Sequence, residues 1–328
     1  MGTYVRTQSI DHNVGETGSV SLNVVSGDVR LRGIAGGEAH IRATFEIKAT
    51  SDADADRIFE AIQLRVDRSG GSLSAEEHGG SKSVGSMIGR LFGNGGDYYE
   101  LTVEADVPTA SQMELHAVSS DVTVTDLRGE QRYNSVSGDL SVNNSGGSVR
   151  LETVSGDATL RAEEQVAVQA QTVSGDLNIT APMLRSLRAN TVSGDIELEA
   201  ELAGNGDFKV ETVSGDLSVG LVGSATFEIH GLSTDVSSEL DHRLEGQIDR
   251  RRLIVGSGGP RLVFNSMSGD VDIRHPRRIS ERPAVPKPAA EPTAAQQESQ
   301  LEVLRALERG EIDVDEATRR LAKGGSDG

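Results

Sequence analysis

The stretch that decides the fold reads SVRLETVSGDATLRA at residues 148–162, VAVQAQTVSGDLNITA at 166–181 and SLRANTVSGDIELEA at 186–200. Each copy has two short runs of alternating apolar and polar residues, joined by Val-Ser-Gly-Asp. The last position of this motif, in full or relaxed form, falls on nine aspartates: Asp28, Asp121, Asp139, Asp157, Asp176, Asp195, Asp216, Asp235 and Asp270. From Asp121 to Asp235 they recur every 18 to 21 residues, and the next step, to Asp270, is 35. A fixed period in this range indicates a solenoid.

The residues around each motif aspartate alternate in polarity. Around Asp157, apolar residues stand eight and six positions before it (Val149, Leu151) and one and three after it (Ala158, Leu160). This alternation predicts β-strands with one buried face. Strands this short cannot enclose a core alone, so each coil must stack on the next at about 4.8 Å per step. The predicted fold class is all-β: a single-stranded parallel β-helix (solenoid) with 18–21-residue coils, an α+β lid inserted after the first coil, and a C-terminal α-helical hairpin.

The glycine and the aspartate of the motif predict the corner of each coil. Glycine permits a positive φ, and aspartate can accept hydrogen bonds from neighbouring backbone amides. The predicted structural corners are Gly27–Asp28, Gly138–Asp139, Gly156–Asp157, Gly175–Asp176, Gly194–Asp195, Gly215–Asp216 and Gly269–Asp270. In the 35-residue gap, Leu253 and Val255 fit the two apolar columns after a corner, which predicts a coil with Arg252 in the aspartate position.

Stacked corners would place carboxylates about 4.8 Å apart along one edge, where neighbouring charges repel by roughly 0.9 kcal/mol in water. Amide hydrogen bonds from the next coil, bound cations or raised pKa values in some members would relieve this repulsion. The favoured interpretation is capped corners with no metal and no cofactor. The alternative is a calcium ladder on Asp139, Asp157, Asp176, Asp195 and Asp216, although the glycine-dense nine-residue repeat of the calcium-loading β-roll is missing.

The repeats and composition shifts divide the chain into three parts. Residues 1–275 form the predicted solenoid domain, with a first coil at 19–33, a lid insertion at 38–108 and the main solenoid at 113–275. In the lid we expect several strands and a helix over 51–62. Residues 276–297 are rich in Pro and Ala and read as a linker. Residues 298–323 read as a helical hairpin, and Leu301, Leu304, Leu307 and Leu321 are the candidate residues for partner binding or self-association.

The charge of −19 argues against some partners. From Pro276 onward there are 9 basic and 10 acidic residues, so the first 275 residues carry about −18, which excludes electrostatic binding of nucleic acid. A peripheral membrane contact through residues 83–92 is a less favoured reading, because few cations accompany the apolar residues there. No transmembrane run or signal core is visible, so we expect a cytoplasmic location, with the cell surface by a nonclassical route as the alternative.

No motif predicts catalysis. The seven histidines include no close pair with metal-ligand spacing, and the chain contains no cysteine, nucleophile elbow, phosphate loop or zinc signature. Some solenoids cleave acidic polysaccharides with aspartate clusters, but few aromatic residues stand in the outward columns here to stack on sugars. We therefore expect a protein that is not an enzyme, and no catalytic residue is assigned.

The recurring (T/S)VSGD followed by an alternating strand, over about residues 19–274, resembles the bacterial putative-adhesin β-solenoid family, whose function is largely unknown. The ending LEVLRALERGEIDVDEATRRL resembles a helical hairpin found in some proteins linked to envelope stress. The resemblance implies a noncatalytic scaffold or binding protein with a protein partner, or one that self-associates, in a bacterial cell-envelope stress response. A surface adhesin-like or polymer-forming protein is the alternative, followed by a cation-binding solenoid or a polysaccharide-active enzyme.

Overall fold

The computed structural model describes residues 2–77, 98–247 and 250–277. The chain divides into two units, residues 1–277 and 278–328, and every described residue belongs to the first. The predicted hairpin with its four leucines, most of the predicted linker and the 83–92 segment therefore lie outside the described residues.

The described part is nearly all β, as predicted, with twenty strands and one helix. The strands and helix of the lid region and first coil are β1 (Gly2–Asn13), β2 (Ser19–Ile34), β3 (Glu38–Ala49), α1 (Asp52–Ile62), β4 (Arg65–Ser69), β5 (Ser72–Glu76) and β6 (Tyr98–Pro108). The central repeats are β7 (Gln112–Thr125), β8 (Glu130–Ser137), β9 (Leu140–Ser155), β10 (Ala158–Ser174), β11 (Leu177–Ser193), β12 (Ile196–Leu202), β13 (Phe208–Ser214) and β14 (Leu217–Val222). The distal strands are β15 (Ala225–Ser233), β16 (Val236–Ser238), β17 (His242–Gln247), β18 (Arg250–Val255), β19 (Arg261–Ser268) and β20 (Val271–Arg274).

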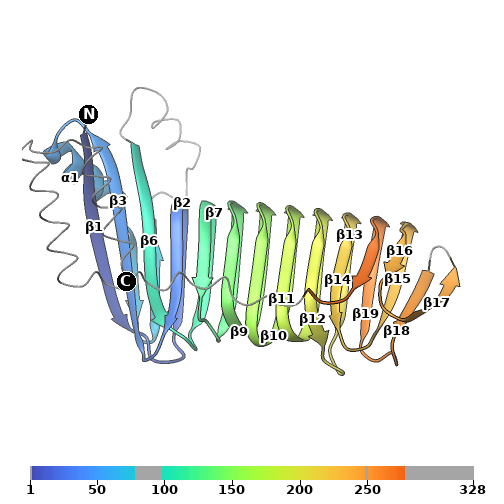
Figure 1. The fold of residues 1–328 in the computed structure, drawn as a ribbon. Helices are drawn as coiled ribbons and strands as arrows, with labels where there is room; N and C mark the ends of the chain where they lie inside the picture. The colour runs from blue at the N-terminus through green and yellow to red at the C-terminus, as the bar shows by residue number, and fades with distance from the viewer. Residues whose placement is uncertain (1, 78–97, 248–249, 278–328) are drawn as a thin grey trace, which may run out of the picture. The chain divides into compact units, whose positions relative to one another are not determined.

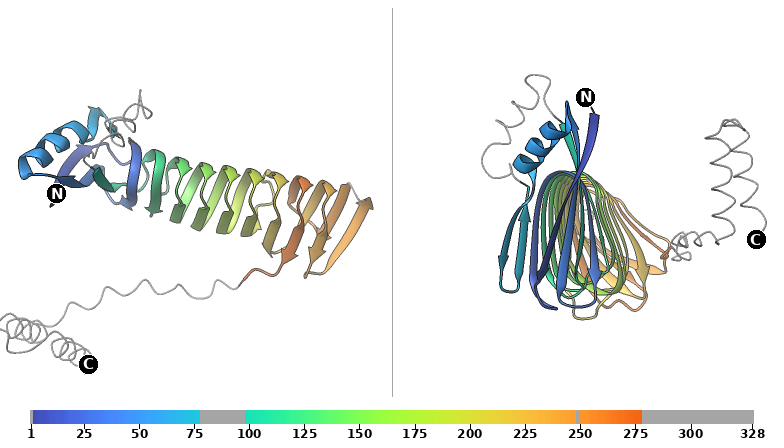
Figure 2. Two further views of the ribbon diagram at one scale, coloured as in Figure 1. Left: turned by 90° about the horizontal axis from the view of Figure 1, so that it is seen from above. Right: turned by 90° about the vertical axis from the view of Figure 1, so that its left-hand side faces the viewer.

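Neighbouring repeats pair in parallel, on both sides of the corner. In β10, Leu160 lies opposite Val142 of β9 and Ile179 of β11, and the same in-register pairing holds for the residues before the corner. The register shifts at the far bend, between Arg161 and Val166, where the repeats differ in length. In the right-hand view of Figure 2, which looks along the stack of repeats, the repeats superimpose as flattened loops. The result is a solenoid-like stack.

The core consists mainly of aliphatic and phenylalanine side chains stacked in columns, with Gln131 and Tyr133 in the two columns before Asp139. The residues eight and six positions before the corner aspartates, and most of those one and three positions after, are at most 3% exposed. An in-register parallel stack places equivalent residues over one another, so one apolar position per repeat becomes a continuous buried column. This explains how a chain with 3% aromatic residues still forms an extended core.

The first coil is covered by the inserted segment. Strand β2 pairs in parallel with β7 on one side and with β5 and β6 on the other. Strand β3 is antiparallel to β6, and β1, which the alternation did not predict, is antiparallel to β3 (Figure 1). Helix α1 packs on this layer through Phe59, whose ring lies 5.5 Å from that of Phe45, and its N-terminus is capped by Ser51.

The predicted coil with Arg252 in the aspartate position is wrong. Strands β17 and β18 form an antiparallel hairpin, and β18 runs antiparallel to β15. Leu253 and Val255 are buried, as their columns required, but they lie opposite Phe227 and Ala225 in a strand of reversed direction. A period-two alternation looks the same in either direction, so it could not reveal this reversal.

The last coil of the described residues inserts between earlier coils. Strand β19 pairs in parallel with β13 on one side and β15 on the other, and β20 does the same with β14 and β16. The coil that is last in sequence is therefore the penultimate one in space, visible in Figure 1 as the darker orange strands beside β13 and β14. The corner aspartates consequently run Asp216, Asp270, Asp235 along the edge.

Candidate functional site

The corner glycines are required by conformation and by close stacking. Gly27, Gly138, Gly156, Gly175, Gly194 and Gly215 have φ between +104° and +157°. A Cβ built on Gly175 would lie 2.3 Å from the carbonyl oxygen of Gly156, and the same clash recurs from coil to coil. Gly269 follows this pattern, since its Cβ would lie 2.1 Å from the carbonyl oxygen of Gly215. At these seven corners the close stacking leaves no room for a Cβ, whereas Ser120 and Thr234 stand in the glycine position of the two remaining corners.

The corner aspartates form a ladder of hydrogen bonds along the same edge. The Oδ1 atom of each accepts a hydrogen bond from the backbone N–H of the next aspartate, at 2.8–3.0 Å. The ladder runs through Asp121, Asp139, Asp157, Asp176, Asp195, Asp216, Asp270 and Asp235. Asp28 lies in register with Asp121. Amide hydrogen bonds, one of the three expected remedies for repulsion between the carboxylates, are thus present.

The described residues show no cluster that indicates a calcium site. Among residues 2–77, 98–247 and 250–277, no group of three or more His, Asp or Glu side chains is placed to hold a metal ion. The ladder on Asp139 to Asp216 binds backbone amides with one oxygen of each carboxylate. Calcium binding by this row stays a prediction, which calorimetry with millimolar calcium would test.

Replacing Asp176 by alanine is expected to destabilise the protein by about 1 kcal/mol, because the N–H of Asp195 loses its acceptor. Asp176→Asn keeps an acceptor oxygen and removes one charge from the row, so its stability is expected to stay within about 0.5 kcal/mol of the parent. Denaturant midpoints of the three proteins measure this difference. Equal losses for the two variants would show that the carboxylate charge, and not the hydrogen bond, matters.

Beside the aspartates runs a stripe of exposed apolar side chains that the sequence analysis did not single out. At seven of the corners, from Asp121 to Asp216 and at Asp270, the residue three positions before the aspartate points outward and is 36–58% exposed. We call Val118, Val136, Val154, Val173, Val192, Val213 and Met267 the valine stripe. Six steps of about 4.8 Å give it a length of roughly 29 Å. The sequence carries a signal of this stripe, because an apolar residue three positions before each aspartate departs from the alternation, but a turn motif alone does not indicate that this residue is exposed.

The flat sides of the stack carry paired charges. Lys209 and Glu211 form an ion pair at 2.9 Å. The hydrogen bond from Lys209, helped by one from Asn265 on β19, lowers the pKa of Glu211. These side chains are exposed and contribute little to stability. The sides are polar and carry ion pairs of this kind, whereas the corner edge combines exposed apolar groups with a row of carboxylates.

The lid end buries a carboxylate. Glu77 is 2% exposed, and its Oε2 accepts a 2.6 Å hydrogen bond from the backbone N–H of Val25, at the corner of the first coil. The Tyr99 hydroxyl donates to Glu77 Oε1. Burial, reinforced by the neighbouring carboxylate of Glu77, raises the pKa of Tyr99 well above its usual range. Glu77 thus accepts the hydrogen bond of the Val25 amide at the corner of the first coil, where no preceding coil supplies an acceptor.

The described histidines make separate local contacts. His116 contacts Asn134 and Glu114, His40 contacts Asp11, and His242 contacts the carbonyl oxygen of Leu240. His230 lies at the distal end, in a depression described below. No helix in the described part of the chain combines the length and the apolar character needed to cross a membrane.

The fold and its corner edge define a solenoid-like repeat protein with an extended, regularly spaced surface. A family model described as Toastrack DUF4097 matches residues 96–186, so this part of the chain is similar to a family of unknown function. No curated protein matches the chain.

Several solved structures align over most of the chain at low identity. One is a "putative cell adhesion protein" from Clostridium sporogenes, with 11% identity, 84% of this chain and 100% of that chain covered, and a TM-score of 0.25. A "putative lipid binding protein" from Parabacteroides distasonis has 12% identity, 81% and 96% coverage, and a TM-score of 0.44. A "putative adhesin" from Bacteroides fragilis has 14% identity, 82% and 97% coverage, and a TM-score of 0.40. At these TM-scores the likeness carries no argument about function.

Proposed function

We propose that this chain is a noncatalytic scaffold that binds a protein partner along its corner edge, in a bacterial cell-envelope stress response. The observation that carries the binding role is the valine stripe beside the aspartate ladder. Exposed apolar stripes rimmed by charge mark interaction surfaces in soluble proteins. A rod this regular offers the same contact at every coil.

The chemistry of the edge defines the partner. Aliphatic side chains of the partner would cover the valine stripe, and Lys or Arg side chains beside them would face the corner carboxylates. The ladder carboxylates are already oriented by their amide hydrogen bonds, so they bind a cation without a further loss of side-chain entropy. The proposed occupant is therefore an elongated protein surface with an apolar strip flanked by basic residues.

The envelope-stress role and the cytoplasmic location rest on the resemblance of the ending at 301–321 and on the sequence expectations. In this proposal the 298–323 hairpin, with Leu301, Leu304, Leu307 and Leu321, recruits a second partner. Cell fractionation tests the location: protein found only outside the cell would favour the adhesin-like alternative and would overturn the cytoplasmic role.

The corner edge is tested by removing its apolar groups from the full chain. Val154→Ser, Val173→Ser and Val192→Ser together are expected to reduce capture of the bound protein from source-cell extract at least tenfold, measured by mass spectrometry. The matched control removes exposed aliphatic side chains elsewhere, with Val5→Ser, Val222→Ser and Leu244→Ser, and should keep the partner. All six positions are 43–55% exposed, so both variants should fold. Equal capture by the two variants, or no specific capture by the parent, would refute binding along this edge.

A further inference from the structure

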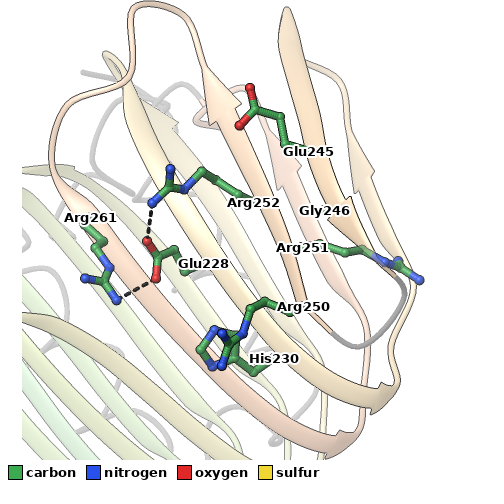
Figure 3. Close-up of a pocket in the computed structure, with 8 residues that line it drawn as sticks. All are labelled: Glu228, His230, Glu245, Gly246, Arg250, Arg251, Arg252 and Arg261. Carbon is green, nitrogen blue, oxygen red and sulfur yellow. Dashed lines mark hydrogen bonds and ion pairs between the residues drawn. The ribbon is translucent and has the colours of Figure 1, made fainter.

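A cluster of positive charge lies at the distal end, away from the corner edge. There, strands β15, β17, β18 and β19 line a depression of about 470 Å³. Its charged lining consists of four arginines and two glutamates: Arg250, Arg251, Arg252, Arg261, Glu228 and Glu245 (Figure 3). This concentration of guanidinium groups stands out in a body that carries about −18 over its first 275 residues.

The reversed direction of β18 and the inserted coil bring these side chains together. In the β15–β18 pairing, Glu228 lies opposite Arg252, and His230 lies opposite Arg250. Strand β19 flanks β15 on the other side, which places Arg261 against Glu228. Residues from three separate parts of the chain therefore share one face.

The charges on this face do not cancel. Glu228 is 14% exposed and pairs with Arg252 at 2.8 Å and with Arg261 at 2.5 Å. The hydrogen bond from Arg252 keeps its pKa below the usual range, with help from Arg261 and His230. Glu245 is neutralised from a neighbouring position, by Arg243 at 2.7 Å.

Arg250 adds a further charge. It is exposed and has no ion-pair partner within residues 2–77, 98–247 and 250–277. Glu228 carries one negative charge but pairs with two arginines, Arg252 and Arg261. Together with Arg250, the three arginines therefore leave this face with a surplus of two positive charges. Arg251 also lines the depression, but its side chain points away from Arg250 and His230 (Figure 3), so it is not counted in this surplus.

We propose that this distal depression is a binding site for a phosphate group, held by Arg250 and His230 and flanked by Arg252 and Arg261. A planar guanidinium group donates two parallel hydrogen bonds to an oxyanion. His230 supplies a ring N–H beside it. A phosphate dianion matches the surplus of two charges, whereas a carboxylate would leave one uncompensated. Glu228 competes with the ligand for Arg252 and Arg261, because it occupies hydrogen-bond donors of both.

The site is tested by titrating the full-length protein with inorganic phosphate in a calorimeter, at ionic strength kept constant with chloride. Arg250→Ala is expected to weaken binding about tenfold or more, which corresponds to about 1.4 kcal/mol. Glu228→Gln removes the competing carboxylate and is expected to strengthen binding several-fold. The control is Arg132→Ala, an exposed arginine of β8 that pairs with Glu114 and Glu130, and it should bind as the parent does. Thermal melts establish that each variant is folded.

A parallel titration with glycerol 3-phosphate distinguishes a site for the free ion from one for a phosphate monoester. Tighter binding of the monoester would assign the ligand to a phosphorylated molecule, and tighter binding of inorganic phosphate would assign it to the free ion. The proposal is overturned if neither ligand binds the parent, or if Arg250→Ala and Arg132→Ala bind equally. It is also overturned if Glu228→Gln binds more weakly than the parent while remaining folded.

Discussion

Replacing Gly175 by alanine is expected to cost about 4 kcal/mol of folding free energy, among the largest effects for adding a single methyl group. Gly175 has a φ of +134°, a region that is strained for any residue with a Cβ. The new Cβ would also lie 2.3 Å from the carbonyl oxygen of Gly156, a backbone atom that the neighbouring coil holds in place. The two costs add, because rotating the residue out of its positive φ would break the corner.

Thermal unfolding monitored by circular dichroism measures this effect. With the entropy of unfolding expected for about 280 residues, 4 kcal/mol corresponds to a fall in Tm of roughly 7 °C. Ser174→Ala is the control, since its exposed side chain precedes the same corner and its loss should change stability by less than about 0.5 kcal/mol. A Gly175→Ala protein that melts with the parent would show that the corners do not touch as described.

Cysteines at Ser218 and Asp272 are expected to form a disulfide almost completely on oxidation, whereas cysteines at Ser218 and Ser237 should stay reduced. Asp272 lies opposite both serines, between them. Adjacent strands place the Cα atoms of Ser218 and Asp272 about 4.8 Å apart, within the range of about 4.4–6.8 Å that a disulfide spans. Ser218 and Ser237 are two strands apart, about 9.6 Å, and cannot be bridged.

The chain contains no native cysteine, so titration of free thiols and mass spectrometry of the linked peptides report on each pair without interference. The experiment tests the order of the coils directly. If coils followed one another in sequence order, the Ser218 and Ser237 pair would be the one that crosslinks. That outcome would contradict the insertion of β19 and β20 between earlier coils and, with it, the contact between Arg261 and Glu228.

The corner edge could be predicted from the sequence because each of its constraints is local. The spacing of the motif aspartates predicted repeats, and the alternation around them predicted strands with one buried face. The geometry of Gly175 and its equivalents has the same origin, since a tight turn that stacks on its own copy leaves no room for a Cβ. The valine stripe was equally local, yet a valine in a turn motif carries no sign of its exposure.

Local sequence patterns did not predict strand β1 or the hairpin of β17 and β18. Strand β1 lies at the edge of the lid sheet and pairs with β3. About half of its residues are exposed, and apolar and polar residues alternate only weakly in its sequence. The buried Glu77 was also unexpected. Its carboxylate is tolerated in the interior because the amide of Val25 and the hydroxyl of Tyr99 satisfy it, and those partners come from distant segments.

By itself, the sequence determined the period of the repeat, the buried columns and the glycine corners. Each depends on residues a few positions apart, repeated often enough to be read. Only the tertiary structure decided the order of the last coils, the direction of β18 and the meeting of Arg250, Arg252 and Arg261 around Glu228. Alternating apolar residues state which face is buried, but they do not specify which neighbour covers it. That choice depends on how the stack as a whole closes its distal end.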